Sequence, residues 1–589
     1  MIGFLKVLLP SQPESILSLF SFQSSQPPVD PTNRTLGNET GVEPLNCDRS
    51  KLQRLTACHQ VKPIGVQDKS VPIQTFWGEL LGGGGGISAT ETSEDCLYLN
   101  VWAPLRYDGT PYPPGTLGVL FFIHGGEFQY DSAFNNLYEG TSLAFKTMGI
   151  VVTFNYRLGP FGFLYDTEMQ RAPEEVPGNV GLRDAAKALE WVHHNIEQFG
   201  GIQDYVTLYG AGAAVQYLMT SPLVPKSYYK RAILSSGVLG SQLSYQSPEI
   251  AKRNARQLST EVEGPSWGDH VKFEALQRSS AESILTFARN LLNESSTMDG
   301  KSMFLPTTDS KFFPLNPKSA LEKMAQESGP AKPVMIGFNQ AEGSYTLAEY
   351  EMVPDGSYPM DALSDAQFTA GVQKIAPETH TPEVLAAVKE QYLMAEVGDL
   401  VIFITDYWYK CDILNTIDAL EKSANRRVFK YRFDAFLDVA RKAYPYFAAG
   451  HAMDRLMIWG RPSVNPSLSS TEERGLSHAM AQLGLNFASE SWDQIESPKG
   501  SILSLQKHSY FGHVNNLKVV EIPDNKCHFI HCLPDLRDWY SLGSMTDESC
   551  RKYVEAEPQT GAAAAPSASI TLTLIGVIFV TWMQHAEGE

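Results

Sequence analysis

The sequence predicts an α/β fold in which helices cover both faces of a large, mostly parallel sheet. Short apolar runs, typical of buried strands, alternate with stretches of helical periodicity through the middle of the chain. Of the 589 residues, 43% are hydrophobic, enough for a large core, which excludes global disorder. A parallel sheet with helices on both sides is the arrangement that buries such an alternation.

The predicted elements follow one another in a regular order. Apolar runs at 118–123 and 149–154 are expected to be buried strands. Residues 182–199 form a helical stripe, and Gly200-Gly201 is expected to end that helix. The next strand, 205–209, runs directly into a helical segment at 213–220. Further strands are predicted at 231–234, 334–338 and 428–433.

The charge balance and the missing motifs exclude several functions. The chain has 47 basic and 66 acidic residues, a net charge of −19, so an acidic surface would repel phosphate and nucleic acid is not an expected partner. The cysteines and histidines lack zinc-site spacing. There is also no phosphate-binding or dinucleotide-binding glycine motif. We therefore expect no metal and no cofactor.

Residues 1–54 are expected to be a signal-like segment followed by a loose extension. The first ten residues are apolar but Lys6 interrupts them, and 11–50 are rich in Ser, Pro, Asn and Thr. Acceptor triplets for N-glycosylation begin at Asn33, Asn38 and Asn293. The interrupted apolar run is a poor signal-peptide core, but the glycosylation triplets favour secretion.

The C-terminal end predicts attachment to a membrane. Residues 554–569 are a small-residue linker, and 570–589 are an apolar tail. The strongly apolar part, 570–583, is short for a spanning helix, which needs about 20 residues. Small residues before a short apolar tail suit a GPI-attachment signal, and a tilted single span is the alternative. Between the two ends, 55–553 form one domain without repeats, with a surface loop at 82–86.

Several motifs in a fixed order carry a family resemblance. They are 93–101 (SEDCLYLNV), 123–126 (IHGG), 155–159 (NYRLG), 178–184 (GNVGLRD) and 200–201 (GG). Over about residues 55–550 the chain resembles the type-B carboxylesterase and cholinesterase family. The resemblance implies an α/β-hydrolase fold. The family's early Gly-Ile-Pro-Tyr-Ala-like segment is not found, so we expect the first small sheet to be rebuilt or absent.

The catalytic motifs depart from the family pattern at two places. The nucleophile elbow G-x-S-x-G reads Gly-Ala-Gly-Ala-Ala at 210–214, which puts Gly212 at the serine position. Ester hydrolysis by this mechanism needs an oxygen nucleophile, and glycine has none. In the loop expected to bind the oxyanion, Gly125 and Gly126 are followed by Glu127 instead of a third glycine. A carboxylate there would repel the developing negative charge.

The other two triad positions are retained. The resemblance places Glu342 at the acid position and His451 at the base position. Without a serine, we expect these two residues to form a buried hydrogen-bonded pair. A literal G-x-S-x-G at 264–268 follows no buried strand and contains Pro265, so it is not expected to be an elbow. Ser235 and Ser236, at the end of a strand, are expected to be structural.

The resemblance also implies two disulfides, Cys58–Cys96 and Cys411–Cys527. Two of the remaining Cys47, Cys532 and Cys550 can pair with each other, which leaves one thiol free or intermolecular. Disulfides of this kind fit an oxidising compartment.

These observations predict a non-catalytic, cholinesterase-like protein at the cell surface, attached to the membrane through its C-terminal tail. Neuroligins of this family also place glycine at the serine position, and adhesion or recognition of an extracellular protein partner is the expected function. One alternative is a carboxylic ester hydrolase with weak activity. Another is a small-molecule binder that uses the gorge. The resemblance implies a homodimer through helices near 395–410 and 535–552.

Overall fold

The computed structural model describes residues 2–8, 43–45, 57–58, 92–166, 178–241, 243–263, 273–294, 304–327, 332–349, 352, 361–376, 382–392, 396–423, 426–438, 449–464, 469–488, 501–506, 518–521 and 526–533. The chain divides into two compact units, Met1–Ser544 and Met545–Glu589, and all described residues belong to the first.

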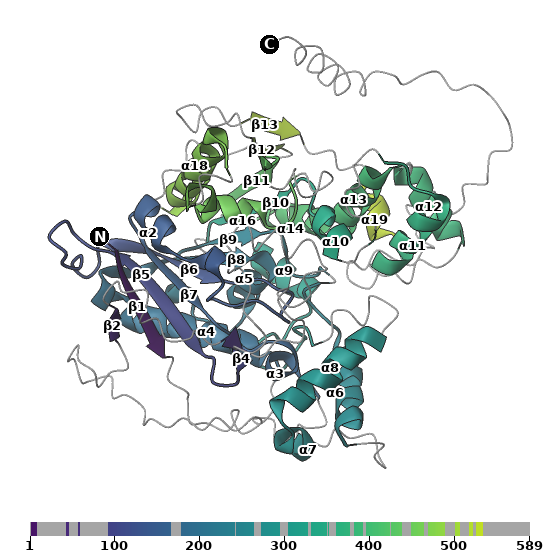
Figure 1. Ribbon diagram of the computed structural model, residues 1–589, viewed down its shortest axis with the longest axis horizontal. Helices are drawn as coiled ribbons and strands as arrows, with labels where there is room; N and C mark the ends of the chain where they lie inside the picture. Colours follow the sequence, from purple (N-terminus) through teal and green to yellow (C-terminus); the bar gives the residue numbers. More distant parts are fainter. Residues whose placement is uncertain are drawn as a thin grey trace, which may run out of the picture. The chain divides into compact units, whose positions relative to one another are not determined.

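The described strands form an 11-stranded sheet in the order β13-β12-β11-β10-β9-β8-β6-β7-β5-β1-β2 (Figure 1). The strands from β12 through β7 in that order run parallel, and β13, β5, β1 and β2 are antiparallel to their neighbours. The strands of this sheet are β1 (Ile2–Leu8), β2 (Glu43–Leu45), β5 (Tyr98–Pro104), β6 (Leu117–Ile123), β7 (Ile150–Phe154), β8 (Gly201–Ala211), β9 (Arg231–Ser235), β10 (Val334–Asn339), β11 (Val428–Phe433), β12 (Ser501–Leu505) and β13 (Lys518–Glu521).

The central strands are apolar along their whole length because both faces of the sheet are covered. Val206 and Leu208 on β8 and Phe121 on β6 have no exposed surface. A parallel strand buried on both faces needs such a continuous apolar run rather than an alternating one. The predicted strands match observed ones, with 149–154 beginning one residue before β7, and the predicted fold class is confirmed.

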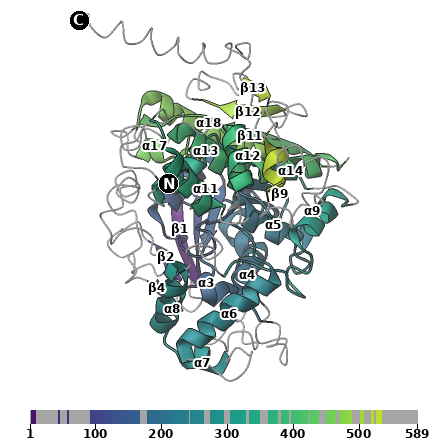
Figure 2. The ribbon, with the colours of Figure 1, turned by 90° about the vertical axis from the view of Figure 1, so that its right-hand side faces the viewer.

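Helices pack on the two faces of the sheet. In Figure 1, α2 (Thr141–Thr147) and α18 (Thr471–Ala488) lie on one side of the sheet, and α4 (Val180–Asn195) lies on the other. The predicted helix end is also observed, since a 3-10 turn at Ile196–Phe199 stops at Gly200. In Figure 2, which is turned by 90° from Figure 1, α4 is seen above α6 (Pro248–Glu263). The other described α-helices are α3 (Gly159–Phe163), α5 (Gly212–Thr220), α6 (Pro248–Glu263), α7 (Phe273–Arg278), α8 (Ala281–Glu294), α9 (Pro317–Ala325), α10 (Gly343–Glu349), α11 (Asp365–Ile375), α12 (Pro382–Tyr392), α13 (Val397–Thr405), α14 (Cys411–Glu421), α16 (Met453–Ile458), α17 (Arg461–Val464) and α19 (Cys527–His531).

The N-terminal segment contributes two strands to the sheet. Ile2–Leu8 is strand β1, antiparallel to β5, and Glu43–Leu45 pairs with it as β2. β1 pairs with β5 along its whole length and so extends the large sheet. A small second sheet is present as well, because β3 (Ala57–Cys58) pairs in parallel with β4 (Thr92–Ser93).

The two disulfides implied by the resemblance are present. Cys58–Cys96 fastens the small sheet, and Cys411–Cys527 joins α14 to α19. Cys532 is also disulfide-bonded. Cys47 and Cys550 lie outside the described residues, as do Asn33, Asn38, the loop 82–86, the motif 264–268, the segment 535–552 and the region 554–589; Asn293 belongs to α8.

Within the described residues, no helix combines the length and the apolar character that crossing a bilayer requires.

Candidate functional site

The predicted site residues meet beyond the carboxyl ends of the parallel strands. The segments that follow β6, β8, β9 and β10 bring Gly125, Gly212, Ser236 and Tyr345 to one cavity of about 80 Å³. His451 and Arg455, from the segment that leads into and forms α16, also line it. This is the edge of an open α/β sheet at which ligands generally bind.

The strand-to-helix elbow has a backbone that excludes a nucleophile. β8 ends at Ala211, and α5 begins directly at Gly212. A Cβ atom at Gly212 would lie 1.9 Å from the carbonyl oxygen of Gly237. A side chain at position 212 would therefore run into the backbone that follows β9, instead of projecting into the cavity as an elbow serine does. Position 212 therefore lacks a hydroxyl, and the local packing also requires a glycine there.

The loop after β6 is tightly turned. Gly126, Glu127 and Phe128 have φ of 94°, 52° and 60°, so three successive residues are left-handed. A Cβ atom at Gly126 would lie 2.1 Å from the carbonyl oxygen of Tyr130, because the amides of Gln129 and Tyr130 both bond to the Gly126 carbonyl. Non-glycine residues in this region carry strain that the surrounding structure must hold in place. Glu127 lines the cavity from this loop.

Glu342 and His451 form the hydrogen-bonded pair that the sequence predicted. Glu342 Oε2 lies 2.7 Å from His451 Nδ1, and the Glu342 side chain is fully buried. Glu342 Oε1 accepts two further bonds from Asn339, from its backbone amide at 2.7 Å and its side-chain amide at 3.2 Å. A carboxylate held by these donors fixes the imidazole so that Nδ1–H points to Glu342 and the Nε2 lone pair faces the cavity.

Arg455 occupies the side of His451 that a nucleophile would use. Arg455 Nη2 lies 3.0 Å from His451 Nε2. Its Nη1 lies 2.9 Å from the place a Cβ atom of Gly125 would take, so the guanidinium sits directly against the oxyanion loop. Arginine is always protonated and can only donate. The lone pair with which a histidine base removes a proton is therefore already bonded.

Buried carboxylates surround the Arg455 cation. Arg455 is 5% exposed, and burial acts to lower its pKa, but Tyr138, Asp454, Tyr209 and Asp131 together raise the pKa above its ordinary value. Asp454 is fully buried and accepts bonds from Ser235 Oγ at 2.6 Å and from the Tyr431 hydroxyl at 2.8 Å. The guanidinium is thus a fixed part of the interior.

The serines near the cavity make other bonds. Ser235 donates to Asp454, and Ser236 Oγ accepts from the side-chain amide of Asn339 at 3.0 Å. Ser241 and Ser244 also line the cavity, and both donate to backbone carbonyls. His451 is hydrogen-bonded to Glu342 and Arg455, and Ser235 and Ser236 are bonded to Asp454 and Asn339 instead.

Aromatic rings narrow the cavity. Tyr345 and Tyr409 lie 5.8 Å and 5.2 Å from the His451 ring, centroid to centroid. Tyr156 also lines the cavity, and the His124 ring stacks on it at 4.3 Å between centroids. Burial lowers the pKa of His124, so its imidazole stays neutral beside the Arg455 cation. Within the described residues there is no cluster of three His, Cys, Asp or Glu side chains able to hold a metal ion.

Sequence reasoning missed Arg455. The available signal is a lone cation in the otherwise apolar stretch 455–459, four residues after His451. That position gave no reason to expect contact with Gly125, which is 330 residues away in the chain.

Comparison with known proteins agrees with this architecture. The carboxylesterase family matches residues 47–532. Acetylcholinesterase of Danio rerio is 36% identical over 261 residues, 43% of this chain and 38% of that protein. Para-nitrobenzyl esterase of Bacillus subtilis is 30% identical over 406 residues, 67% of this chain and 74% of that protein.

A third relative, acetylcholinesterase 1 of Caenorhabditis elegans, is 28% identical over 456 residues, 72% of this chain and 70% of that protein. The chain spans well under half of the length of the Danio rerio protein, but the family match covers most of this chain. With its mostly parallel sheet, its two disulfides and its ordered motifs, the chain belongs to the carboxylesterase family.

Proposed function

We propose that this protein is a non-catalytic member of the carboxylesterase family that acts in recognition at the cell surface. The observation that supports the loss of catalysis best is the bond between Arg455 Nη2 and His451 Nε2 at 3.0 Å. Three independent features then oppose ester hydrolysis: Gly212 supplies no oxygen, the His451 lone pair is occupied, and Glu127 places a carboxylate beside the oxyanion loop.

The proposal does not depend on the gorge as a binding site. A cavity of about 80 Å³ is far below the 300–1,000 Å³ or so of sites that enclose a drug-sized ligand. Arg455, Tyr345 and Tyr409 line that small space. We therefore favour recognition through the outer surface over both alternatives, the weak hydrolase and the gorge binder.

The test of inactivity is hydrolysis of p-nitrophenyl acetate by the purified protein. We expect no saturable turnover, and a rate equal to that of His451→Ala, since His451 cannot act as a base. A matched reaction with a fluorophosphonate probe should label no serine. Saturable turnover that disappears in His451→Ala would overturn the proposal.

Recognition at the surface rests on the scaffold that the chain retains. The two disulfides suit an oxidising compartment, and the acceptor triplets at Asn33, Asn38 and Asn293 suit secretion. Attachment through the tail at 570–589 belongs to the same proposal. It is tested by expressing the full chain in cells and measuring surface biotinylation with and without a phospholipase that cleaves GPI anchors. Surface protein released by the enzyme indicates a lipid anchor, whereas an entirely intracellular protein would contradict the proposal.

Homodimerisation through α13 completes the proposal. α13 carries Ile402, an exposed large hydrophobic side chain at 48% exposure, on a helix whose remaining apolar residues are buried. This helix lies in the region that the family resemblance assigns to a dimer contact.

A further inference from the structure

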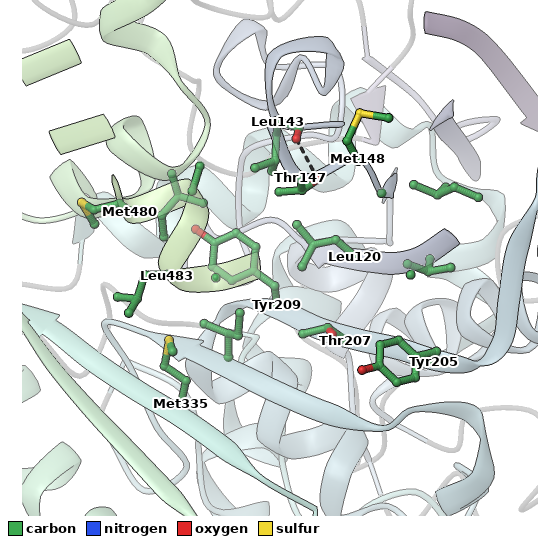
Figure 3. Close-up of a pocket in the computed structure, with 18 of the residues that line it drawn as sticks. Leu120, Leu143, Thr147, Met148, Tyr205, Thr207, Tyr209, Met335, Met480 and Leu483 are labelled. Atoms are coloured by element: carbon green, nitrogen blue, oxygen red, sulfur yellow. Dashed lines mark hydrogen bonds between the residues drawn. The ribbon is translucent and has the colours of Figure 1, made fainter. Parts of the chain in front are cut away.

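A second cavity lies on the face of the sheet that α2 and α18 cover. Its volume is about 360 Å³. It is lined by residues near the amino ends of β6 and β7, by one face of β8, and by α2, α16 and α18 (Figure 3). The cavity around His451 lies beyond the carboxyl ends of the same strands. No residue lines both cavities.

The lining of this cavity is mostly apolar and carries no charged side chain among the described residues. Figure 3 shows Leu120 and Leu143 on one side and Met335, Met480 and Leu483 on the other. Thioether side chains are flexible and polarisable, so they adapt to ligands of different shape. The described lining residues include no Lys, Arg, His, Asp or Glu, so nothing there would neutralise a charged ligand.

One polar group in the lining has no partner. Tyr209 projects from β8 into the cavity (Figure 3) and is 1% exposed. The Trp459 indole N–H faces its hydroxyl oxygen but can only donate, so the hydroxyl proton has no acceptor. The two other buried tyrosines nearby are satisfied, since Tyr431 donates to Asp454 at 2.8 Å and Tyr138 donates to Asp131 at 2.7 Å. Burial raises the pKa of Tyr209, so its hydroxyl remains protonated and able to donate. A buried donor without an acceptor is costly, and a ligand oxygen would remove that cost.

The cavity reaches the surface beside the C-terminal end of α2. Met148, the residue that caps this helix, lines the cavity and is 48% exposed. Its neighbour Thr147 is satisfied internally, because its hydroxyl donates to the Leu143 carbonyl at 2.8 Å, as the dashed line in Figure 3 marks. A ligand would enter past a flexible methionine and then meet only uncharged side chains, most of them apolar, until it reached Tyr209.

We propose that this cavity binds a neutral, single-chain aliphatic molecule that carries one terminal oxygen, of the class of medium-chain fatty alcohols. The volume fits the lower part of the range of about 300–1,000 Å³ that ligand sites occupy. The chain lies along the methionines and leucines, and the oxygen accepts the hydrogen bond that Tyr209 has no other group to give. This inference is independent of the proposed recognition function, since none of the residues that line this cavity also lines the cavity around His451.

The test is equilibrium dialysis of radiolabelled dodecanol against the full chain, with dodecane as the ligand that lacks the oxygen. We expect saturable binding of both, with dodecanol bound more tightly. Tyr209→Phe should weaken dodecanol binding by about tenfold, the equivalent of one hydrogen bond, and leave dodecane binding unchanged. Tyr209→Phe removes a buried hydroxyl proton that has no acceptor, so its thermal unfolding midpoint should stay close to that of the native protein.

Filling the cavity gives the second arm of the test. Ala481→Phe places a ring against the lining from α18 and should abolish binding of both ligands. His478→Phe, at an exposed position of the same helix, is the matched control and should bind normally. Leu483→Phe is an independent filling variant if Ala481→Phe does not fold. Binding that persists in the filling variants, or no binding by the native protein, would overturn the proposal.

Discussion

Arg455 donates a hydrogen bond from Nη2 to Nε2 of His451 across 3.0 Å, in the position from which a serine hydroxyl would approach the base. On its other side His451 is held by Glu342 at 2.7 Å. Both nitrogens of the imidazole are thereby engaged, one by a carboxylate and one by a permanent cation. The acid–base pair of a hydrolase is kept in place, but its reactive lone pair serves the interior of the protein.

The elbow predicts the outcome of restoring the missing serine. Gly212→Ser should yield no esterase activity, because its Cβ would lie 1.9 Å from the Gly237 carbonyl oxygen. It should also lower the free energy of unfolding by about 1–3 kcal/mol through overpacking. The control is Gly484→Ser in α18, where a Cβ meets nothing within 4 Å; its unfolding free energy should stay within about 0.5 kcal/mol of native. Urea unfolding measures the stability of each variant, and ester hydrolysis measures its activity. An active Gly212→Ser would contradict the prediction.

Occupation of the His451 lone pair predicts low chemical reactivity. Diethyl pyrocarbonate attacks an imidazole nitrogen through its free lone pair, so native His451 should react slowly, although its side chain is 21% exposed. Arg455→Met frees Nε2 and should raise the rate roughly tenfold, the factor for one lost hydrogen bond. Peptide mass spectrometry gives the rate at each histidine, and exposed His478 should react equally in both proteins. Equal rates at His451 would show that the guanidinium does not shield it.

The buried Glu342 carboxylate predicts that replacing it lowers the stability of the protein. In Glu342→Gln, one acceptor oxygen becomes an amide that faces the donors of Asn339 or His451. We expect the unfolding free energy to fall by about 1–3 kcal/mol, as for other buried groups left unsatisfied. Glu190→Gln is the control, since Glu190 is 39% exposed and its bridge to Lys187 contributes less than about 0.5 kcal/mol. Chemical unfolding gives the unfolding free energy of both variants. An equal loss of unfolding free energy in Glu342→Gln and Glu190→Gln would contradict the prediction.

His124 predicts how stability depends on pH. Burial lowers the pKa of His124 below its ordinary value of 6.5. As the pH falls below 6.5, the unfolded chain takes up a proton that the native protein does not, so stability is lost until the lowered pKa is reached. His124→Phe keeps the ring that stacks on Tyr156 and should flatten this dependence, whereas His194→Gln, at an exposed position, should not. Unfolding free energies across this pH range would reveal an unchanged slope in His124→Phe if the prediction is wrong.

The exposed face of α13 predicts the assembly state. Ile402→Asp should convert a dimer to a monomer, because a charge would be buried in the contact. Leu223→Asp, at a position 51% exposed away from α13, should leave the dimer intact. Sedimentation equilibrium measures the mass of each variant, and a native monomer or a dimeric Ile402→Asp would contradict the proposed contact.

The sequence by itself determined the fold class and the identity of the altered site residues. Continuous apolar runs such as 118–123 can be buried only between two covering layers, and this local pattern indicates a parallel sheet. The family resemblance carried by the ordered motifs then assigned Gly212, Glu342 and His451 to the triad positions. Cys58–Cys96 and Cys411–Cys527 came from the family resemblance and not from spacing.

Only the tertiary structure decided what fills the space around those residues. The direction of a Cβ at Gly212, the contact of Arg455 with His451, and the empty volume around Tyr209 all depend on segments far apart in the chain. The apolar run at Ile2–Leu8 likewise became a strand because β5 offered it an edge. Local patterns specify which element a segment forms, whereas side-chain packing between distant elements decides which atoms meet.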